Sequence, residues 1–100
     1  MAAGAYVQLL GQPGVRDGNH SIDFLPNKRF QLLAYLAYQN DWVSRDKLAF
    51  LFWPDETDHT ARHNLRQLLK YLRKMDWLTD LEADEQRLRW QVETDAAALK

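Results

Sequence analysis

The sequence predicts an α+β domain: a winged helix-turn-helix with an N-terminal antiparallel sheet, three helices and a C-terminal β-hairpin wing. Strand-like stretches separated by turn residues occupy residues 5–25, and three helix patterns follow over 27–75. Two further alternating stretches occupy 77–92, and the third helix pattern is basic. A basic helix that closes a three-helix unit and precedes a hairpin is typical of winged-helix proteins. We expect the 100 residues to form one such domain.

The N-terminal strands are expected between recognisable turns. Residues 5–10 (AYVQLL) have the composition of a strand that ends at the turn residues 11–14 (GQPG). Residues 15–16 and 21–24 flank Asp-Gly-Asn at 17–19, a strong hairpin signal. A small antiparallel sheet is therefore predicted at the start of the chain.

The first helix is predicted to begin after Asn27, a good N-cap residue, and to run to about Gln39. Its spacing places one apolar face toward a core: Phe30, Leu33, Ala34 and Ala37.

A short extended segment at Trp42 and Val43 is expected to lead into the second helix. Ser44 is predicted to cap that helix, Arg45–Phe52, and Pro54 prevents it from continuing.

The third helix pattern, about 58–75, is the most informative part of the chain. Residues 59–75 contribute +5 to a total charge of −1 and contain no carboxylate, so the other residues carry −6. On a helical projection one arc is polar: His59, Arg62, His63, Arg66, Gln67, Lys70, Arg73 and Lys74. The opposite arc is apolar, with Asn64 and Tyr71 at one seam: Ala61, Leu65, Leu68, Leu69, Leu72 and Met75. Such a helix can bury one face and present the other to a polyanion, which predicts a nucleic-acid recognition helix.

The wing is predicted from two strands, 77–81 and 87–92, joined by a turn at 83–86. The inward residues of the second strand are expected to be Leu88, Trp90 and Val92. Four acids precede the first arginine of the wing: Asp80, Glu82, Asp84 and Glu85. Because phosphate would repel this tip, Arg87 and Arg89 are the only wing residues predicted to reach DNA, and the tip can instead face another protein.

Several segments, in this order, resemble the DNA-binding domain of SARP-type bacterial transcriptional activators, an OmpR/PhoB-like winged helix. They are residues 25–28 (LPNK), 32–37 (LLAYLA), 42–48 (WVSRDKL), 53–55 (WPD), 61–67 (ARHNLRQ) and 71–73 (YLR). The resemblance covers about residues 5–95. It implies a third helix in the major groove, binding to direct repeats near promoters and recruitment of RNA polymerase. A helical activation domain usually follows in this family, so the chain is expected to be an excised domain or a short stand-alone regulator.

Specific DNA contacts are predicted from residue type and spacing. Arg62, Arg66 and Lys70 stand four residues apart and span roughly 12 Å of helix, which suits a major groove about 12 Å wide. The predicted base contacts are Arg62, His63, Asn64, Arg66, Gln67 and Lys70. The predicted contacts to the DNA backbone are Ser44, Arg45, Lys47, Thr60, Arg73 and Lys74.

Each of these groups also has a purely structural interpretation. The basic helix face can be a solvated amphipathic face, and Ser44 can be an N-cap beside two surface charges. The loop Pro54, Asp55 and Glu56 faces polymerase in OmpR/PhoB-like domains, yet acids here also suit the N-terminus of the next helix. The four tryptophans can stack on single-stranded bases, but their spacing favours packing.

Catalysis, metal binding and membrane insertion are not expected. His59 and His63 have the spacing of two zinc ligands, but Thr60 replaces the glutamate of the metalloprotease motif and no third ligand is evident. There is no cysteine and no glycine-rich phosphate loop, so no enzyme activity, cofactor or small-molecule substrate is predicted. The longest apolar run, 32–38, is too short to span a bilayer, and no signal peptide pattern begins the chain. A cytoplasmic location is expected.

Two functions remain open at this point. Sequence-specific binding to double-stranded DNA in transcription regulation, most simply activation, explains the basic helix. The alternative is a winged-helix protein-interaction module that does not bind DNA, which the acidic wing and the net charge of −1 favour.

Overall fold

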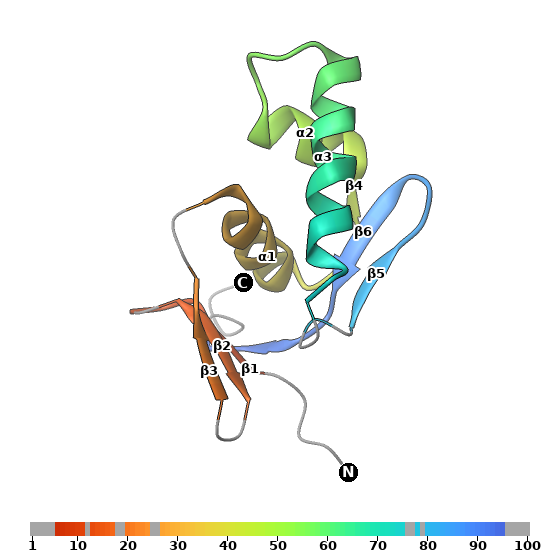
Figure 1. The fold of residues 1–100 in the computed structure, drawn as a ribbon. Coiled ribbons are helices and arrows are strands. Elements are labelled where there is room, and N and C mark those ends of the chain that lie inside the picture. The colour runs from red at the N-terminus through yellow and green to blue at the C-terminus, as the bar shows by residue number, and fades with distance from the viewer. Residues whose placement is uncertain are drawn as a thin grey trace. The chain divides into compact units, whose positions relative to one another are not determined.

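The computed structural model describes residues 6–11, 13–17, 20–24, 27–75, 78 and 80–95, without the side chains of Asp17 and His20. The described chain contains three helices, with short strands before, between and after them in the sequence (Figure 1). An N-terminal sheet, three helices and a C-terminal hairpin follow in the predicted order, which confirms the α+β winged-helix class. The chain divides into two compact units: residues 1–41 with 90–100, and residues 42–89.

The first unit contains a four-stranded sheet of order β3-β2-β1-β7. Its strands are β1 (Tyr6–Gln8), β2 (Gly14–Asp17), β3 (His20–Asp23) and β7 (Glu93–Thr94). The pairs β1–β2 and β2–β3 are antiparallel as predicted, with Val7 opposite Val15 and Val15 opposite Ile22. Strand β7, which the sequence did not predict, adds to this antiparallel set as a parallel neighbour of β1, so the complete sheet is mixed.

Asp95 attaches the C-terminal strand to β1. Its Oδ1 accepts a hydrogen bond from Leu9 N at 2.7 Å, and its Oδ2 accepts one from Leu10 N at 3.2 Å. The amide of Asp95 also donates to the carbonyl of Val7 at 3.3 Å. Strand β7 has only two residues, but the side chain of Asp95, the next residue in the chain, continues the pairing with β1 past the end of the strand. These additional hydrogen bonds explain why so short a strand is stable here.

Helix α1 (Lys28–Gln39) belongs to the same unit and packs against β7. Asn27 caps it as predicted, and its side chain accepts from Phe30 N at 3.1 Å. The helix ends at Asn40, whose left-handed φ of 55° stops the helix. The buried residues are Phe30, Leu32, Leu33, Leu36 and Ala37, so the predicted face omitted two leucines and wrongly included Ala34, which is half-buried.

The second unit is formed by β4 (Val43–Ser44), α2 (Arg45–Phe52), α3 (Asp58–Leu72), β5 (Leu81–Ala83) and all of β6 (Arg87–Trp90) except its last residue. Helices α2 and α3 pack against each other, and the strands form a sheet of order β4-β6-β5 (Figure 1). In that sheet Val43 lies opposite Leu88 and Ser44 opposite Arg87. The core residues of this unit are Val43, Leu48, Ala49, Ala61, Leu65, Leu69, Leu72, Leu78 and Leu88.

The predicted wing needs two corrections. Its first strand begins at Leu81, later than the predicted 77–81, and its second ends at Trp90, two residues before Val92. Leu88 and Trp90 are buried as predicted, whereas Val92 is only half-buried. Parts of several predictions lie outside the described residues: Ala5, Gln12, Gly18, Asn19, Leu25, Pro26, Trp77 and Thr79.

Candidate nucleic-acid interface

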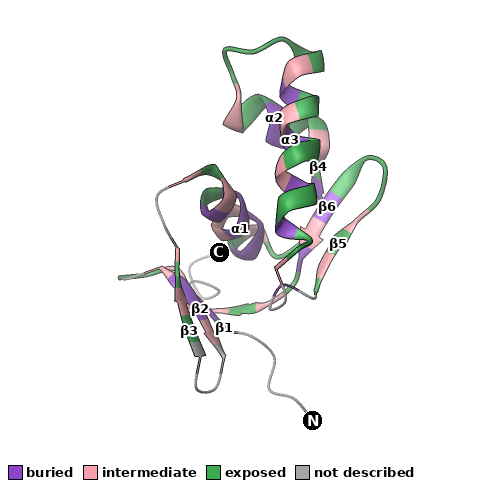
Figure 2. Cartoon of the chain, viewed as in Figure 1, coloured by how far each residue is buried: buried purple, intermediate pink, exposed green. Residues whose placement is uncertain are grey.

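Helix α3 has one buried and one exposed face (Figure 2). The buried residues Ala61, Leu65, Leu69 and Leu72 recur every three or four positions and form the stripe that packs into the second unit. Thr57 caps the helix: its Oγ1 accepts from Thr60 N at 3.1 Å and donates to Thr60 Oγ1 at 3.0 Å. The helix start is therefore fixed both by its cap and by the core beneath it.

The exposed face carries the predicted base-contacting residues. Arg62, His63, Arg66, Gln67 and Lys70 are exposed and Asn64 is half-buried at the seam. The only carboxylate in α3 is Asp58, its first residue, where the helix dipole favours an acid. The rest of the face presents three permanent cations and no anion, which suits a phosphate-lined groove.

Helix α3 is shorter than predicted: it ends at Leu72, whereas the prediction placed its end near residue 75. Arg73 is the C-cap, and its N–H donates to the carbonyls of Leu69 and Tyr71. The next amides, Lys74 N and Met75 N, bond three residues back at 3.1 and 3.0 Å, which tightens the chain into a turn. Arg73 and Lys74 are exposed but lie on this turn, past the helical face to which they were assigned.

Two members of the predicted apolar arc are less buried than expected. Leu68 and Met75 are half-buried, and the seam residue Tyr71 is 51% exposed. The buried stripe is thus narrower than the arc drawn on an ideal helix, since only four residues of α3 are fully covered.

The N-terminus of α2 holds the predicted backbone contacts Ser44, Arg45 and Lys47. Ser44 Oγ accepts from Lys47 N at 3.0 Å, which confirms the predicted N-cap. Arg45 is partly occupied by the wing: its Nε donates to the carbonyl of Asp84 at 2.9 Å, and its amide donates to the carbonyl of Gln86 at 2.8 Å. The Lys47 side chain is exposed, and the described residues form no ion pair with it.

A groove of about 660 Å³ brings α2, α3 and the wing tip together. Of the predicted contacts it gathers Ser44, Arg45, Arg62, Arg66 and Arg87. Asp46, Leu65, Glu85 and Gln86 complete its lining. Four guanidinium groups outnumber two carboxylates, so the side chains that line the groove carry a net positive charge. His63, Gln67, Lys70, Arg73 and Lys74 do not line it.

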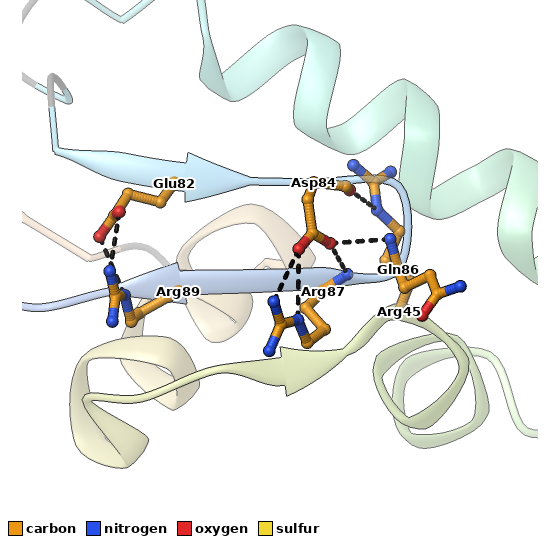
Figure 3. A network of polar contacts seen from close by, with 6 residues as sticks. All are labelled: Arg45, Glu82, Asp84, Gln86, Arg87 and Arg89. Carbon is orange, nitrogen blue, oxygen red and sulfur yellow. Dashed lines mark hydrogen bonds and ion pairs between the residues drawn. The ribbon is translucent and has the colours of Figure 1, made fainter.

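The wing arginines are engaged by wing acids (Figure 3). Arg89 forms two hydrogen bonds with Glu82, and Arg87 binds Asp84 at 3.0 Å through Nη2 and at 3.2 Å through Nε. Both guanidinium groups also lie over the Trp42 ring, 4.5 and 4.4 Å from its centroid. The hydrogen bond from Arg89 lowers the pKa of Glu82, and the pKa of Asp84 is lowered mainly by the amide of Gln86 and further by Arg87.

This network changes the interpretation of the wing. Two of the four predicted repulsive acids are neutralised by the two arginines, so the wing is neither as acidic nor as free to bind phosphate as the sequence indicates. The cross-strand spacing could have indicated this pairing, because Glu82 and Arg89 stand symmetrically about the turn residues 85 and 86. Trp42, expected in a core or seam position, is half-buried under the arginines.

The loop between α2 and α3 exposes Pro54, Asp55 and Glu56. Thr57, the last loop residue, is the N-cap of α3. Next to the loop, Phe50 of α2 is 70% exposed and Leu51 is 45% exposed. No prediction from the sequence covered Phe50, although the apolar run at 48–53 (LAFLFW) is too continuous for one helix face to bury.

In the part of the chain that the structure describes, no three His, Asp or Glu side chains gather as a metal site requires. No described helix is both long and apolar enough to cross a membrane. No family model, curated protein or solved structure matches this chain.

Proposed function

We propose that this chain binds specific sequences of double-stranded DNA and regulates transcription, with α3 in the major groove. The observation that carries the proposal is the division of α3 into a buried apolar stripe and an exposed face with Arg62, Arg66 and Lys70 and no acid after Asp58. A recognition helix needs both faces, because the core must fix the helix while its side chains reach base edges.

The second unit supports this assignment with a helix-turn-helix and an adjacent groove rich in arginine. The caps Ser44 and Thr57 orient the starts of α2 and α3, where backbone N–H groups favour phosphate. Arg45, Arg66 and Arg87 line the groove beside α3, and the turn carrying Arg73 and Lys74 follows it. We assign base contacts to the exposed face of α3, which includes Arg66, and phosphate contacts to Arg45, Arg73 and Lys74.

The resemblance to SARP-type activators extends the proposal to direct repeats near promoters, to polymerase recruitment and to the cytoplasm of a bacterium. The proposed function involves no cofactor and no catalysis. Because the wing arginines are already bound by wing acids, we expect α3 and α2 to supply most of the contacts to DNA.

A second function, a protein-interaction module without DNA binding, is favoured by one observation. Phe50 presents an aromatic ring at 70% exposure next to the acidic loop Asp55 and Glu56. Exposed aromatic residues are enriched at protein interfaces. A protein contact at this face is compatible with DNA binding through α3, so the test must address DNA directly.

The test is selection of bound duplexes from a random DNA pool, followed by affinity measurements at several salt concentrations. We expect a recovered motif and a log–log salt slope of about 0.9 per phosphate contact. The double variant Arg66→Ala/Lys70→Ala should lose binding while retaining its far-UV circular dichroism. A matched control, Lys28→Ala/Arg29→Ala, removes the same charge from α1 and should retain the motif. Absence of enrichment near 50 mM salt, where the electrostatic contribution is strong, would favour the protein-interaction function.

A further inference from the structure

Arg62 differs from the other cations of α3 because an acid from α2 holds it. Its Nη2 lies 2.8 Å from Oδ1 of Asp46, in the first turn of α2. Among the described residues no ion pair involves Arg66 or Lys70. The first cation of the recognition face is thus oriented by a second helix, whereas the next two are not.

The contact leaves Arg62 able to bind DNA. A guanidinium group has five N–H donors in a planar fork, and a single carboxylate oxygen occupies only part of it. The side chains of Arg62 and Asp46 remain 58% and 70% exposed. Because α2 and α3 pack against each other, the carboxylate is presented from a fixed backbone and restricts the rotamers of Arg62.

The same carboxylate opposes phosphate at this place. Asp46 and Arg62 both line the groove beside α3, so a phosphate approaching Arg62 would meet a like charge within a few ångströms. A guanine edge presents two neutral acceptors, O6 and N7, and pays no such repulsion. Asp46 therefore weakens the binding of Arg62 to a phosphate more than its binding to a guanine edge.

We propose that Asp46 is a positioning residue that directs Arg62 to a guanine edge and suppresses its binding to phosphate. The inference rests on the proposed DNA binding of α3 and adds a determinant of specificity to it. Under this assignment one acid of α2 sets the sequence preference of one cation of α3.

Two simpler roles of Asp46 must be separated from this one. An acid in the first turn of a helix stabilises that helix through its dipole, independently of Arg62. A carboxylate can also read a base itself, by accepting from the amino group of cytosine. The first role predicts a change in stability without a change in preference, and the second predicts a preference at a different base pair.

The experiment compares the full chain with Asp46→Asn, Arg62→Ala and the double variant. Each protein is titrated with the selected duplex and with all its single-base-pair substitutions, and thermal unfolding is recorded in parallel. We expect Asp46→Asn to lose about tenfold discrimination at one base pair, the order that a bidentate arginine contact provides. Arg62→Ala should lose preference at the same base pair, and the double variant should match Arg62→Ala, because the two residues act as a unit.

Asp58→Asn is the matched control. Asp58 is also a first-turn acid, at the start of α3, and no described residue forms an ion pair with it. Both Asn variants should raise non-specific affinity about two- to fivefold by removing a negative charge near DNA. Only Asp46→Asn should lower discrimination.

Three results would overturn the inference while leaving DNA binding intact. They are unchanged discrimination in Asp46→Asn, an additive loss at a different base pair, and an equal loss of discrimination in Asp58→Asn. Failure of the unmodified chain to select any motif would instead overturn the proposed function, and the inference with it.

Discussion

Arg89 and Glu82 face each other across the wing hairpin and form two parallel hydrogen bonds, Nε–Oε1 at 2.9 Å and Nη2–Oε2 at 2.8 Å. This fork geometry is the strongest arrangement of an arginine with a carboxylate. Trp42 lies under the same guanidinium group, 4.4 Å from ring centroid to Cζ, and also under that of Arg87. The two wing arginines are therefore bound by acids of the wing and by the Trp42 ring. The wing is an ordered hairpin with paired charges and not a free basic loop.

Arg89→Ala should affect stability more than DNA affinity. Its side chain is 23% exposed and stacked on Trp42, and loss of that stacking should cost about 1 kcal/mol of unfolding free energy. Because its guanidinium group is already bound by Glu82, the affinity for the selected duplex should change less than about twofold, within the range of a weak rim charge. Chemical unfolding and duplex titration measure the two quantities. Arg66→Ala should show the opposite pattern, and a tenfold affinity loss in Arg89→Ala would place the wing on DNA.

The wing network should open in acid. The pKa values of Glu82 and Asp84 are both lowered by their hydrogen bonds, so the folded form favours the ionised carboxylates. Their contribution to stability is complete above the unfolded-state values near pH 4 and is lost as the pH falls through the lower folded-state values. An NMR titration that follows the Arg89 and Arg87 Nε–H signals should show the loss below about pH 4.

Glu82→Gln provides the control for this titration. The substitution keeps the shape of the side chain and removes one of the two charges, so the Arg89 signal should lose its acid transition while the Arg87 signal keeps its own. An Arg89 transition unchanged by Glu82→Gln would show that another group controls it.

The parts of the fold that local chemistry determines were predicted from the sequence. Asn27 and Ser44 were recognised as caps, and α2 was predicted with its observed bounds, because caps and proline act within a few residues. Strand β7 was missed because its two residues form a strand only through pairing with β1, at the far end of the sequence. The end of α3 was overestimated because Arg73 and Lys74 are good helix formers and no glycine or proline marks the stop.

The candidate site shows the same division between local and long-range information. Helical periodicity was sufficient to place Arg62, Arg66 and Lys70 on one exposed face. It could not show that Arg62 pairs with Asp46, or that Arg45 reaches the Asp84 carbonyl, because these contacts join residues 16 and 39 positions apart. Packing of α2 on α3 and the register of the wing determine them.

Thr57→Ala should destabilise the start of the recognition helix. The substitution removes the oxygen that accepts from Thr60 N, and loss of such a cap costs about 1 kcal/mol. Urea unfolding should report the loss, and amide hydrogen exchange at Thr60 should accelerate. Thr57→Ser retains the hydroxyl and should remain close to the unmodified chain. Equal destabilisation by both substitutions would mean that the threonine methyl group, and not the cap, stabilises this turn.

Phe50→Ser should separate DNA binding from transcription. Since Phe50 is 70% exposed, its replacement should change unfolding free energy by no more than about 0.5 kcal/mol. Affinity for the selected duplex should be unchanged, because the ring belongs to α2 near the α2–α3 loop and is not part of the exposed face of α3. If the polymerase recruitment that we propose runs through this loop, transcription from a promoter carrying the selected site should fall severalfold in a reconstituted bacterial system.

Leu10→Ser is the matched control for Phe50→Ser, because Leu10 is an exposed apolar residue of the first unit, at 49% exposure. It should leave both DNA affinity and transcription near the level of the unmodified chain. Normal transcription with Phe50→Ser would show that polymerase does not bind the face formed by α2 and the α2–α3 loop. An equal reduction by both variants would indicate that the assay responds to loss of surface apolar residues in general. A reduction confined to Phe50→Ser, with the duplex fully bound, would assign the two activities to different helices of the same helix-turn-helix: DNA to α3 and the polymerase to α2.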